Sequence, residues 1–344
     1  MATTKVFLTG ASGYLGGETL YQLSRLARPI QLRCLVRDAQ KAAAISEAYP
    51  TVGIVPGDLD DSGLIEREAR DADVVLHLAS TKHEGSSQAI VAGLSSSRRR
   101  QTPTPGGRHW IQISGASMFS NAEVQAGRYG EPSDRVYDDV RDVAEIIHEV
   151  IRSNPARVVD ILALDQDAAT VRTALLPGPL IYGEGRGPLN KRSIQGPEVV
   201  EYTLRNGRSF AVGKGQAAWS NVHVSDVGAM IVLLLEAAID GRDGLWNQDG
   251  IFFPEAGLMS FGDIAKRISQ AAVEAGLIAS DEVKSLTPEE ADQFRPHSAV
   301  LFGTNARLKS SRARRDLGWS PSGPALEDTI VAAVQEESKR VNSG

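Results

Sequence analysis

Short apolar runs alternate with stretches of helical periodicity over the first half of the chain. Buried strands are predicted at Lys5–Thr9, Ile30–Val36, Thr51–Val55, Asp73–Leu78, His109–Ile113 and Val171–Leu176. Apolar residues recur at helical spacing between the first two runs, and again from Tyr137 to Ile151 between the last two. Repetition of strand, helix and strand predicts right-handed crossovers and an α/β fold with a doubly wound parallel sheet.

The pattern changes after Pro177. Glycine and proline become frequent in the sequence LLPGPLIYGEGRGPLN, which indicates that the sheet gives way to a smaller region covering it. A further helix is predicted from Ser225, its expected N-cap, through the apolar run that ends at Ile239.

Composition narrows the class of protein. The chain has 344 residues, 42% of them hydrophobic and 23% charged, which is typical of a soluble globular protein. The formal net charge of −6 argues against a general nucleic-acid-binding protein. The single cysteine, Cys34, excludes an intrachain disulfide and is expected to be buried. Because no signal-peptide or membrane-span pattern is evident, we expect a cytoplasmic protein with no membrane partner; import into an organelle stays open.

The sequence FLTGASGYLGG, Phe7–Gly17, carries the clearest motif. Gly10, Gly13 and Gly16 follow a predicted strand and precede an amphipathic helix. In that context, small residues let a pyrophosphate approach the backbone at a helix N-terminus. The motif predicts a dinucleotide-binding, Rossmann-type site. The candidate contacts in it are Thr9, Gly10, Ser12, Gly13, Tyr14, Leu15 and Gly16.

The end of the second strand bears on the choice of cofactor. An acidic residue there favours NAD through the ribose hydroxyls, whereas a basic one pairs with the 2′-phosphate of NADP. The sequence CLVRDAQ places Arg37 first and Asp38 next, so we predict NADP(H) over NAD(H) with Arg37 holding the phosphate. In PGDLDD, Asp58 either contacts the adenine edge, beside Leu59, or serves the turn alone.

Four stretches together resemble one family. They are TGASGYLGG (Thr9–Gly17), VVLHLAS (Val74–Ser80), PLIYGEG (Pro179–Gly185) and NVHVSDVG (Asn221–Gly228). The chain thus resembles an extended or atypical short-chain dehydrogenase/reductase of the NAD-dependent epimerase/dehydratase type. The resemblance implies a seven-stranded Rossmann sheet and a smaller C-terminal substrate-binding region. We expect residues 1–177 and part of 215–250 in the first, and 178–214 and 251–344 in the second.

The family's catalytic apparatus is a serine or threonine with a Tyr-x-x-x-Lys helix. By resemblance, Tyr137 in RVYDDVRDVAEIIHEV stands at the tyrosine, which exchanges a proton with a substrate carbonyl or hydroxyl. Arg141 stands where the lysine would lower the pKa of the phenol and hold the nicotinamide ribose. Its planar guanidinium keeps the charge but not the geometry of an ammonium.

The serine position also departs from the family. In ISGASMFS, Gly115 falls on the usual serine, so Ser117 is the first candidate for the hydroxyl and Ser114 the second. Both serines could instead only cap the turn. The resemblance further implies cofactor contacts from Leu78, Ala79 and Ser80, and from Pro179 and Leu180 beside the nicotinamide, in addition to Tyr137 and Arg141.

Two basic segments have open interpretations. Ser95–Gly107 (SSSRRRQTPTPGG) is either a solvated loop or a phosphate-binding patch. Gly185–Ser193 (GRGPLNKRS) carries cations that either meet an anionic substrate or face solvent. No histidine has metal-ligand spacing, and no metal is expected.

The leading prediction is an NADP(H)-dependent oxidoreductase acting on a carbonyl or secondary alcohol of a small organic molecule. The alternatives are an epimerase, dehydratase or isomerase that uses bound NAD(P), and a catalytically impaired NADP-binding regulatory protein. The expected partner is a small-molecule substrate and not a nucleic acid, and homodimer formation stays open.

Overall fold

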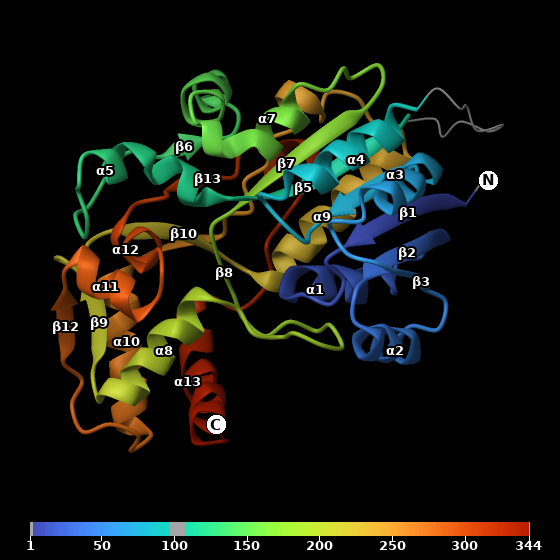
Figure 1. Cartoon of the computed structure of the whole chain (residues 1–344). Helices are drawn as coiled ribbons and strands as arrows, with labels where there is room; N and C mark the ends of the chain where they lie inside the picture. Colours follow the sequence, from blue (N-terminus) through green and yellow to red (C-terminus); the bar gives the residue numbers. More distant parts are fainter. Residues whose placement is uncertain (1–2, 97–106, 344) are drawn as a thin grey trace.

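A six-stranded parallel sheet forms the centre of the described part of the molecule. The computed structural model of the chain describes residues 3–96 and 107–343, so most of the basic segment Ser95–Gly107 lies outside it. The strands are β1 (Thr4–Thr9), β2 (Ile30–Val36), β3 (Gly53–Pro56), β4 (Val74–His77), β5 (His109–Gly115) and β7 (Arg172–Gly178). Their order, β3-β2-β1-β4-β5-β7, is that of a Rossmann-type sheet and confirms the predicted fold class (Figure 1).

Helices cover both faces of this sheet because its strands are apolar on both sides. One face packs on α1 (Tyr14–Leu23) and α9 (Val224–Ile239), where Leu8, Cys34 and Ile111 are buried. The other packs on α3 (Ser62–Asp71), α4 (Glu84–Leu94) and α7 (Val158–Leu164), where Phe7 and Trp110 are buried. The helix α2 (Ala39–Ala48) follows β2. The prediction that Cys34 is buried is confirmed.

The family's seventh strand is reduced to a single contact among the described residues. Leu175 of β7 forms an isolated parallel bridge with Ile251, closed by hydrogen bonds of 2.7 Å from Leu175 N to Gly250 O and 3.0 Å from Phe252 N to Leu175 O. The expectation of seven strands is therefore wrong by one, since only one residue pair continues the sheet beyond β7.

Smaller sheets and a helical layer follow β7. The strands β8 (Leu180–Tyr182), β10 (Ala218–His223) and β11 (Gly257–Ser260) form one sheet, and β9 (Ser209–Val212) pairs with β12 (Val283–Leu286). The longer helices there are α8 (Gln195–Asn206), α10 (Phe261–Glu274) and α13 (Leu326–Ser343). The short elements elsewhere are η1 (Ala116–Ser120), α5 (Asn121–Gln125), η4 (Asn247–Asp249), α11 (Pro288–Phe294), α12 (Ser298–Gly303) and η5 (Ala313–Leu317).

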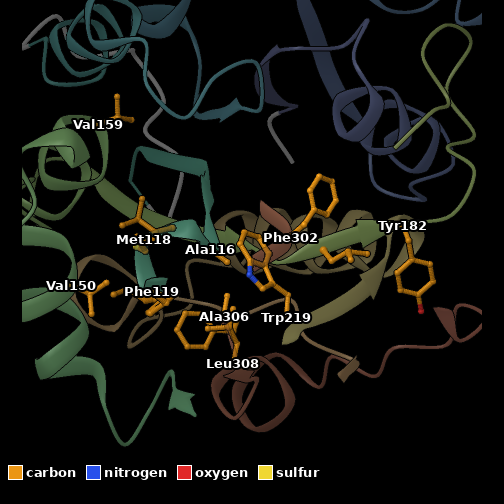
Figure 2. Close-up of a cluster of buried hydrophobic side chains, with 14 of the residues drawn as sticks. Ala116, Met118, Phe119, Val150, Val159, Tyr182, Trp219, Phe302, Ala306 and Leu308 are labelled. Atoms are coloured by element: carbon orange, nitrogen blue, oxygen red, sulfur yellow. The ribbon is translucent and has the colours of Figure 1, made fainter. Parts of the chain in front are cut away.

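One apolar cluster joins these layers to the central sheet. Ala116, Met118 and Phe119, just after β5, belong to the same buried cluster as Trp219 and Phe302 of the later segments (Figure 2). The Phe119 ring also packs 5.4 Å from that of Phe253. The chain that follows β5 is thus held by contacts with residues far away in the sequence.

The helix predicted from Tyr137 to Ile151 is wrong at its start. Tyr137–Asp138 form a short strand, β6, paired in parallel with β13 (Leu308–Lys309). The Asp138 carboxylate accepts hydrogen bonds from the backbone N–H groups of Val140 and Arg141, which turns the chain before a helix begins. Helical structure starts only at α6 (Val143–Glu145), continues as the π-helix η2 (Ile146–Arg152), and resumes through η3 (Pro155–Arg157) into α7.

The start of α9 also differs from the prediction. His223, and not Ser225, is the N-cap, because the His223 imidazole accepts a hydrogen bond from the backbone N–H of Ser225. The Ser225 hydroxyl lies 2.7 Å from the same Nδ1 atom. Ser225 therefore supports the cap instead of forming it.

Candidate functional site

The glycine turn between β1 and α1 leaves its backbone open. Gly10 has φ +87°, and a Cβ atom there would lie 2.8 Å from the backbone nitrogen of Ala79. A Cβ on Gly16 would lie 2.0 Å from the Gly10 carbonyl oxygen. Gly13 is the N-cap of α1 and provides no side-chain cap, so the first-turn N–H groups can bind an anion. This cradle fits a pyrophosphate.

Buried polar groups form hydrogen-bond contacts with the turn from the protein interior. Thr9 Oγ1 lies 2.6 Å from His77 Nδ1, and His77 Nε2 lies 3.2 Å from Ser86 Oγ. Burial lowers the pKa of His77 to about 4, so the imidazole is neutral near pH 7. His77 is thus a satisfied core histidine, and Thr9 holds the turn from inside the protein.

A hollow of about 360 Å³ extends from the turn toward the ends of β2 and β3. Arg37 is exposed there and forms no salt bridge within residues 3–96 and 107–343. Asp38 instead caps α2 by accepting a hydrogen bond from Lys41 N at 2.9 Å. One carboxylate oxygen is therefore engaged at the helix, and the guanidinium is available to a ligand. The predicted residues in this lining are Gly10, Ser12, Arg37, Asp58, Leu59 and Ala79.

Two further residues line this hollow. Lys41 stands in the first turn of α2. His83 caps α4 by accepting a hydrogen bond from Ser86 N, and its Nε2 lies 3.1 Å from Asp60. The signal for Lys41 was its place one helical turn after Arg37, which brings a second cation to the same end.

A second hollow, of about 490 Å³, lies on the other side of Ala79. Ala79 lines both, so the two hollows adjoin at this residue, and together they are called the groove. Leu180 is in the core with 2% exposure, and its neighbour Ile181 lines the groove instead. The reason is strand alternation in β8, which turns adjacent side chains to opposite faces. The predicted residues in this lining are Tyr14, Leu15, Leu78, Ala79, Ser80 and Pro179.

Tyr137 and Arg141 are not among the residues that line either hollow. The Tyr137 ring packs 4.7 Å from Phe119 and carries the Arg135 guanidinium at 4.4 Å. The Arg141 guanidinium donates to the neighbouring Asp142 and to Val136 O, with 64% of its side chain exposed. The expectation that the two share a helix face is wrong, because no helix spans them.

The carboxylates beside Tyr137 are structural. Asp138 and Asp139 are buried. Asp139 accepts hydrogen bonds from the backbone N–H groups of Phe253, Ser311 and Arg312, at 3.0, 2.8 and 2.8 Å. These contacts fasten β6 to β13 and to the segment that follows it.

The serine candidates lie beside a charged pair that the sequence reading did not single out. A Cβ on Gly115, at the family's serine position, would lie 3.8 Å from Ser117 Oγ. Arg157 Nη2 donates to Ser117 Oγ at 3.2 Å, and its Nη1 lies 3.8 Å from Asp160 Oδ2. Ser114 is buried on β5, on the side that packs against α7. The i, i+3 spacing of Arg157 and Asp160 in an otherwise apolar helix was the missed signal.

Burial governs the charge state of Asp160. Its side chain has no exposed surface, and burial raises its pKa to about 6. The Ser114 hydroxyl and the Arg157 guanidinium oppose that shift.

The cations of Gly185–Ser193 mostly meet carboxylates of this chain. Arg186 pairs with the buried Glu18 of α1 and stacks 4.5 Å from the Tyr21 ring. Arg192 donates to Glu337 at 2.8 Å. Tyr14 Oη donates to Gly183 O at 2.7 Å, so the loop is attached to α1. The sequence left open whether these cations meet an anionic substrate or face solvent; Arg186 and Arg192 instead pair with carboxylates of the same chain.

Within the described ranges, no group of three or more histidine, cysteine or acidic side chains could hold a metal ion. No helix in the same ranges is long and apolar enough to cross a membrane.

Comparison with known proteins identifies a relative of this chain and solved structures with a similar fold. No family model matches it. It is 34% identical to the oxidase ucsJ of Acremonium sp over 351 residues, which covers 98% of this chain and 99% of that protein. A dTDP-glucose 4,6-dehydratase of Streptomyces venezuelae, solved with NAD and TYD, matches with TM-score 0.68 and 16% identity over 99% and 98% of the two chains. A UDP-glucuronic acid 4-epimerase of Bacillus cereus, solved with UDP-glucuronic acid and NAD, matches with TM-score 0.66 and 16% identity over 98% and 100%.

The fold and the groove define an α/β protein of the nucleotide-binding, Rossmann type. The chain belongs to the same family as the oxidase ucsJ, and it shares its fold with the solved dehydratase and epimerase.

Proposed function

We propose that the protein is an NADP(H)-dependent oxidoreductase that interconverts a carbonyl and a secondary alcohol on a small organic molecule. The observation that carries the NADP preference is Arg37, which is exposed in the groove lining without a salt bridge in the described ranges, while one oxygen of Asp38 caps α2. A guanidinium recognises a phosphate by charge-assisted hydrogen bonds. The relative called an oxidase supports redox chemistry.

The chain's own residues have separate tasks in this proposal. The turn at Gly10–Gly16 binds the pyrophosphate, and Arg37 binds the 2′-phosphate at the far end of the groove. Tyr14, Ile181 and Pro179 line the other end, where the nicotinamide and the substrate would meet. The nicotinamide, when bound, donates or accepts the hydride. A hydroxyl at the end of β5 holds the substrate oxygen, and this oxygen takes its proton from water, or returns it to water, as the hydride is transferred.

Epimerase, dehydratase or isomerase chemistry is the second candidate. The observation that favours it is the likeness over nearly the whole chain to structures named as a dehydratase and an epimerase. Such an enzyme would return its cofactor to the starting oxidation state, so no net NADPH consumption would occur.

Two measurements test the proposal. Calorimetric titration with NADPH, NADP⁺, NADH and NAD⁺ should show binding, tightest for the phosphorylated pair; absence of heat at millimolar levels would refute it. Absorbance at 340 nm, with a panel of ketones, aldehydes and quinones, should then show net NADPH oxidation. Tight binding with no net oxidation on any substrate favours the second candidate or a regulatory protein.

A further inference from the structure

The two hollows of the groove differ in chemical character. The hollow of about 360 Å³ is lined by several charged side chains, among them Arg37, Lys41 and Asp58. The hollow of about 490 Å³ is lined mainly by apolar side chains, which include Leu15, Leu78, Ile113, Pro179, Ile181 and Ile194. A concave apolar lining binds apolar ligands, because both surfaces leave water when they meet.

Ile194 extends this apolar lining into solvent. At 62% it is the most exposed of the large hydrophobic residues in the described part of the chain, and it stands at the start of α8. Ile181, on β8, lines the same hollow. A ligand that covers Ile194 removes apolar surface from water, which favours an apolar body in the bound molecule.

Lys82 brings a single charge to this apolar hollow. Among the described residues that line it, Lys82 carries the only formal charge near pH 7, because Tyr14 is neutral. Burial raises the pKa of the Tyr14 phenol, which donates its proton to Gly183 O at 2.7 Å. The Lys82 side chain is exposed and its amino group has no ion pair or hydrogen bond within residues 3–96 and 107–343.

The cations of the neighbouring loop are not available in the same way. Arg186 pairs with the buried Glu18, and Arg192 with Glu337 at 2.8 Å. Lys191 Nζ lies 3.6 Å from Glu184 Oε1. This end of the groove therefore offers a ligand one unpaired positive charge, which matches a single carboxylate better than a multiply charged diphosphate.

The backbone at Lys82 is held in place by two sets of contacts. Ser80 Oγ accepts hydrogen bonds from the backbone N–H groups of Lys82 and His83, both at 3.1 Å. Gln112 Nε2, on β5, donates to Ser80 O at 2.9 Å. The turn that carries the amino group is thus ordered without a ligand, so binding an anion there loses less conformational entropy.

We infer that the substrate is an apolar carbonyl compound that also carries one carboxylate, and that Lys82 is the residue that selects it. This inference rests on the proposed function. Lys82 pairs with the carboxylate, while Ile194 and the apolar lining cover the body of the molecule. Lys82 determines specificity and takes no part in the transfer of the hydride or the proton.

The test compares two ligands that differ in charge but hardly in shape. Naphthoate and naphthamide both resist hydride, so calorimetry can follow their binding to the NADPH complex without a reaction. The wild-type complex should bind naphthoate about tenfold more tightly than naphthamide, the difference expected for one charge-assisted contact. Acetate has the charge without the apolar body and should bind at least about tenfold more weakly than naphthoate.

Variants assign the preference to single residues. Lys82→Met keeps the apolar stem and removes the charge, so naphthoate should bind only as tightly as naphthamide does, while NADPH affinity changes by less than about twofold. Lys82→Arg should retain the preference for naphthoate. Ile194→Ser should weaken both ligands about equally, by roughly threefold to tenfold. Lys339→Met, which alters an exposed lysine of α13 that pairs with Glu336, is the matched control and should change none of these affinities.

Each contrary result has a separate meaning. Equal binding of naphthoate and naphthamide to the wild-type complex, binding of neither, or a preference that survives in Lys82→Met overturns the inference. A marked loss of NADPH affinity in Lys82→Met also overturns it, because Lys82 would then hold the cofactor and not the substrate. Failure of the wild-type protein to bind NADPH overturns the proposed function instead.

Discussion

The glycine turn of residues 9–17 follows β1, and the segment of residues 137–164 contacts the chain just after β5, but the two regions are built differently. The turn presents backbone atoms, and the residues that shape it lie within eight positions of one another, apart from Ala79. The other segment presents side chains held by distant partners: Tyr137 pairs with Leu308, and Arg157 with Ser117. A backbone site is determined locally, whereas a side-chain site depends on how the whole chain packs.

The largest effect is expected from a substitution that disrupts the glycine turn. Gly16→Ala places a Cβ 2.0 Å from the Gly10 carbonyl oxygen, so backbone must move. We expect a loss of about 3 kcal/mol in the free energy of unfolding, and no NADPH binding in the calorimeter. Urea unfolding measures the first quantity. The matched control is Gly196→Ala, where no atom lies within 4 Å of the added Cβ. An NADPH affinity unchanged in folded Gly16→Ala would show that the turn does not bind the cofactor.

A smaller effect separates the two cofactors at the end of the groove. Arg37→Ala should weaken NADPH binding by about thirtyfold, the equivalent of about 2 kcal/mol for a charge-assisted contact. NADH binding should stay almost constant, because NADH lacks the 2′-phosphate. Fluorescence titration of both nucleotides provides the comparison, with Arg25→Ala as the control. Equal losses for NADPH and NADH would contradict the assignment of Arg37.

Lowering the pH should change the stability contributions of His77 and Asp160 in opposite directions. Burial lowers the pKa of His77, under the turn, to about 4, so its stabilising effect is complete above the unfolded value and is lost as pH falls toward 4. Burial raises the pKa of Asp160 to about 6, so its effect is complete below the unfolded value and is lost as pH rises through 6.

Variants isolate these two contributions to the pH dependence of stability. Between pH 4.5 and 5.5, His77 and Asp160 contribute opposing slopes of at most about 1.4 kcal/mol per pH unit each to the wild-type unfolding free energy. His77→Gln should make stability decrease more steeply as pH rises, and Asp160→Asn should make it increase more steeply. Urea titrations at several pH values measure both. Parallel pH profiles for the wild type and either variant would refute that residue's assignment.

The smallest expected effect concerns Tyr137. Since its ring packs on Phe119 and does not line the groove, Tyr137→Phe should change stability and NADPH oxidation by less than about 0.5 kcal/mol, or twofold in rate. Steady-state rates at 340 nm provide the measurement. If Tyr137→Phe abolished turnover but left NADPH affinity unchanged, Tyr137 would be the proton donor after all. The segment of residues 137–164 would then supply the proton for the reaction.

The sequence by itself determined the parallel sheet, the order of its alternating helices and the nucleotide turn. Each depends on apolar periodicity or on glycine spacing within about ten residues, which local sterics and burial control. Leu180 shows the limit of that information. Adjacent side chains of a strand point to opposite faces, so Leu180 is buried in the core while its neighbour Ile181 lines the groove.

Only the tertiary structure decided which side chains stand around the end of β5. Tyr137 lies in a strand and not in a helix, because it pairs with β13, about 170 residues later in the chain. Arg157 meets Ser117 because α7 packs against β5 across an interrupted helix. Such contacts join residues far apart in the chain, and their energy depends on burial and on partner geometry that no short window of sequence contains.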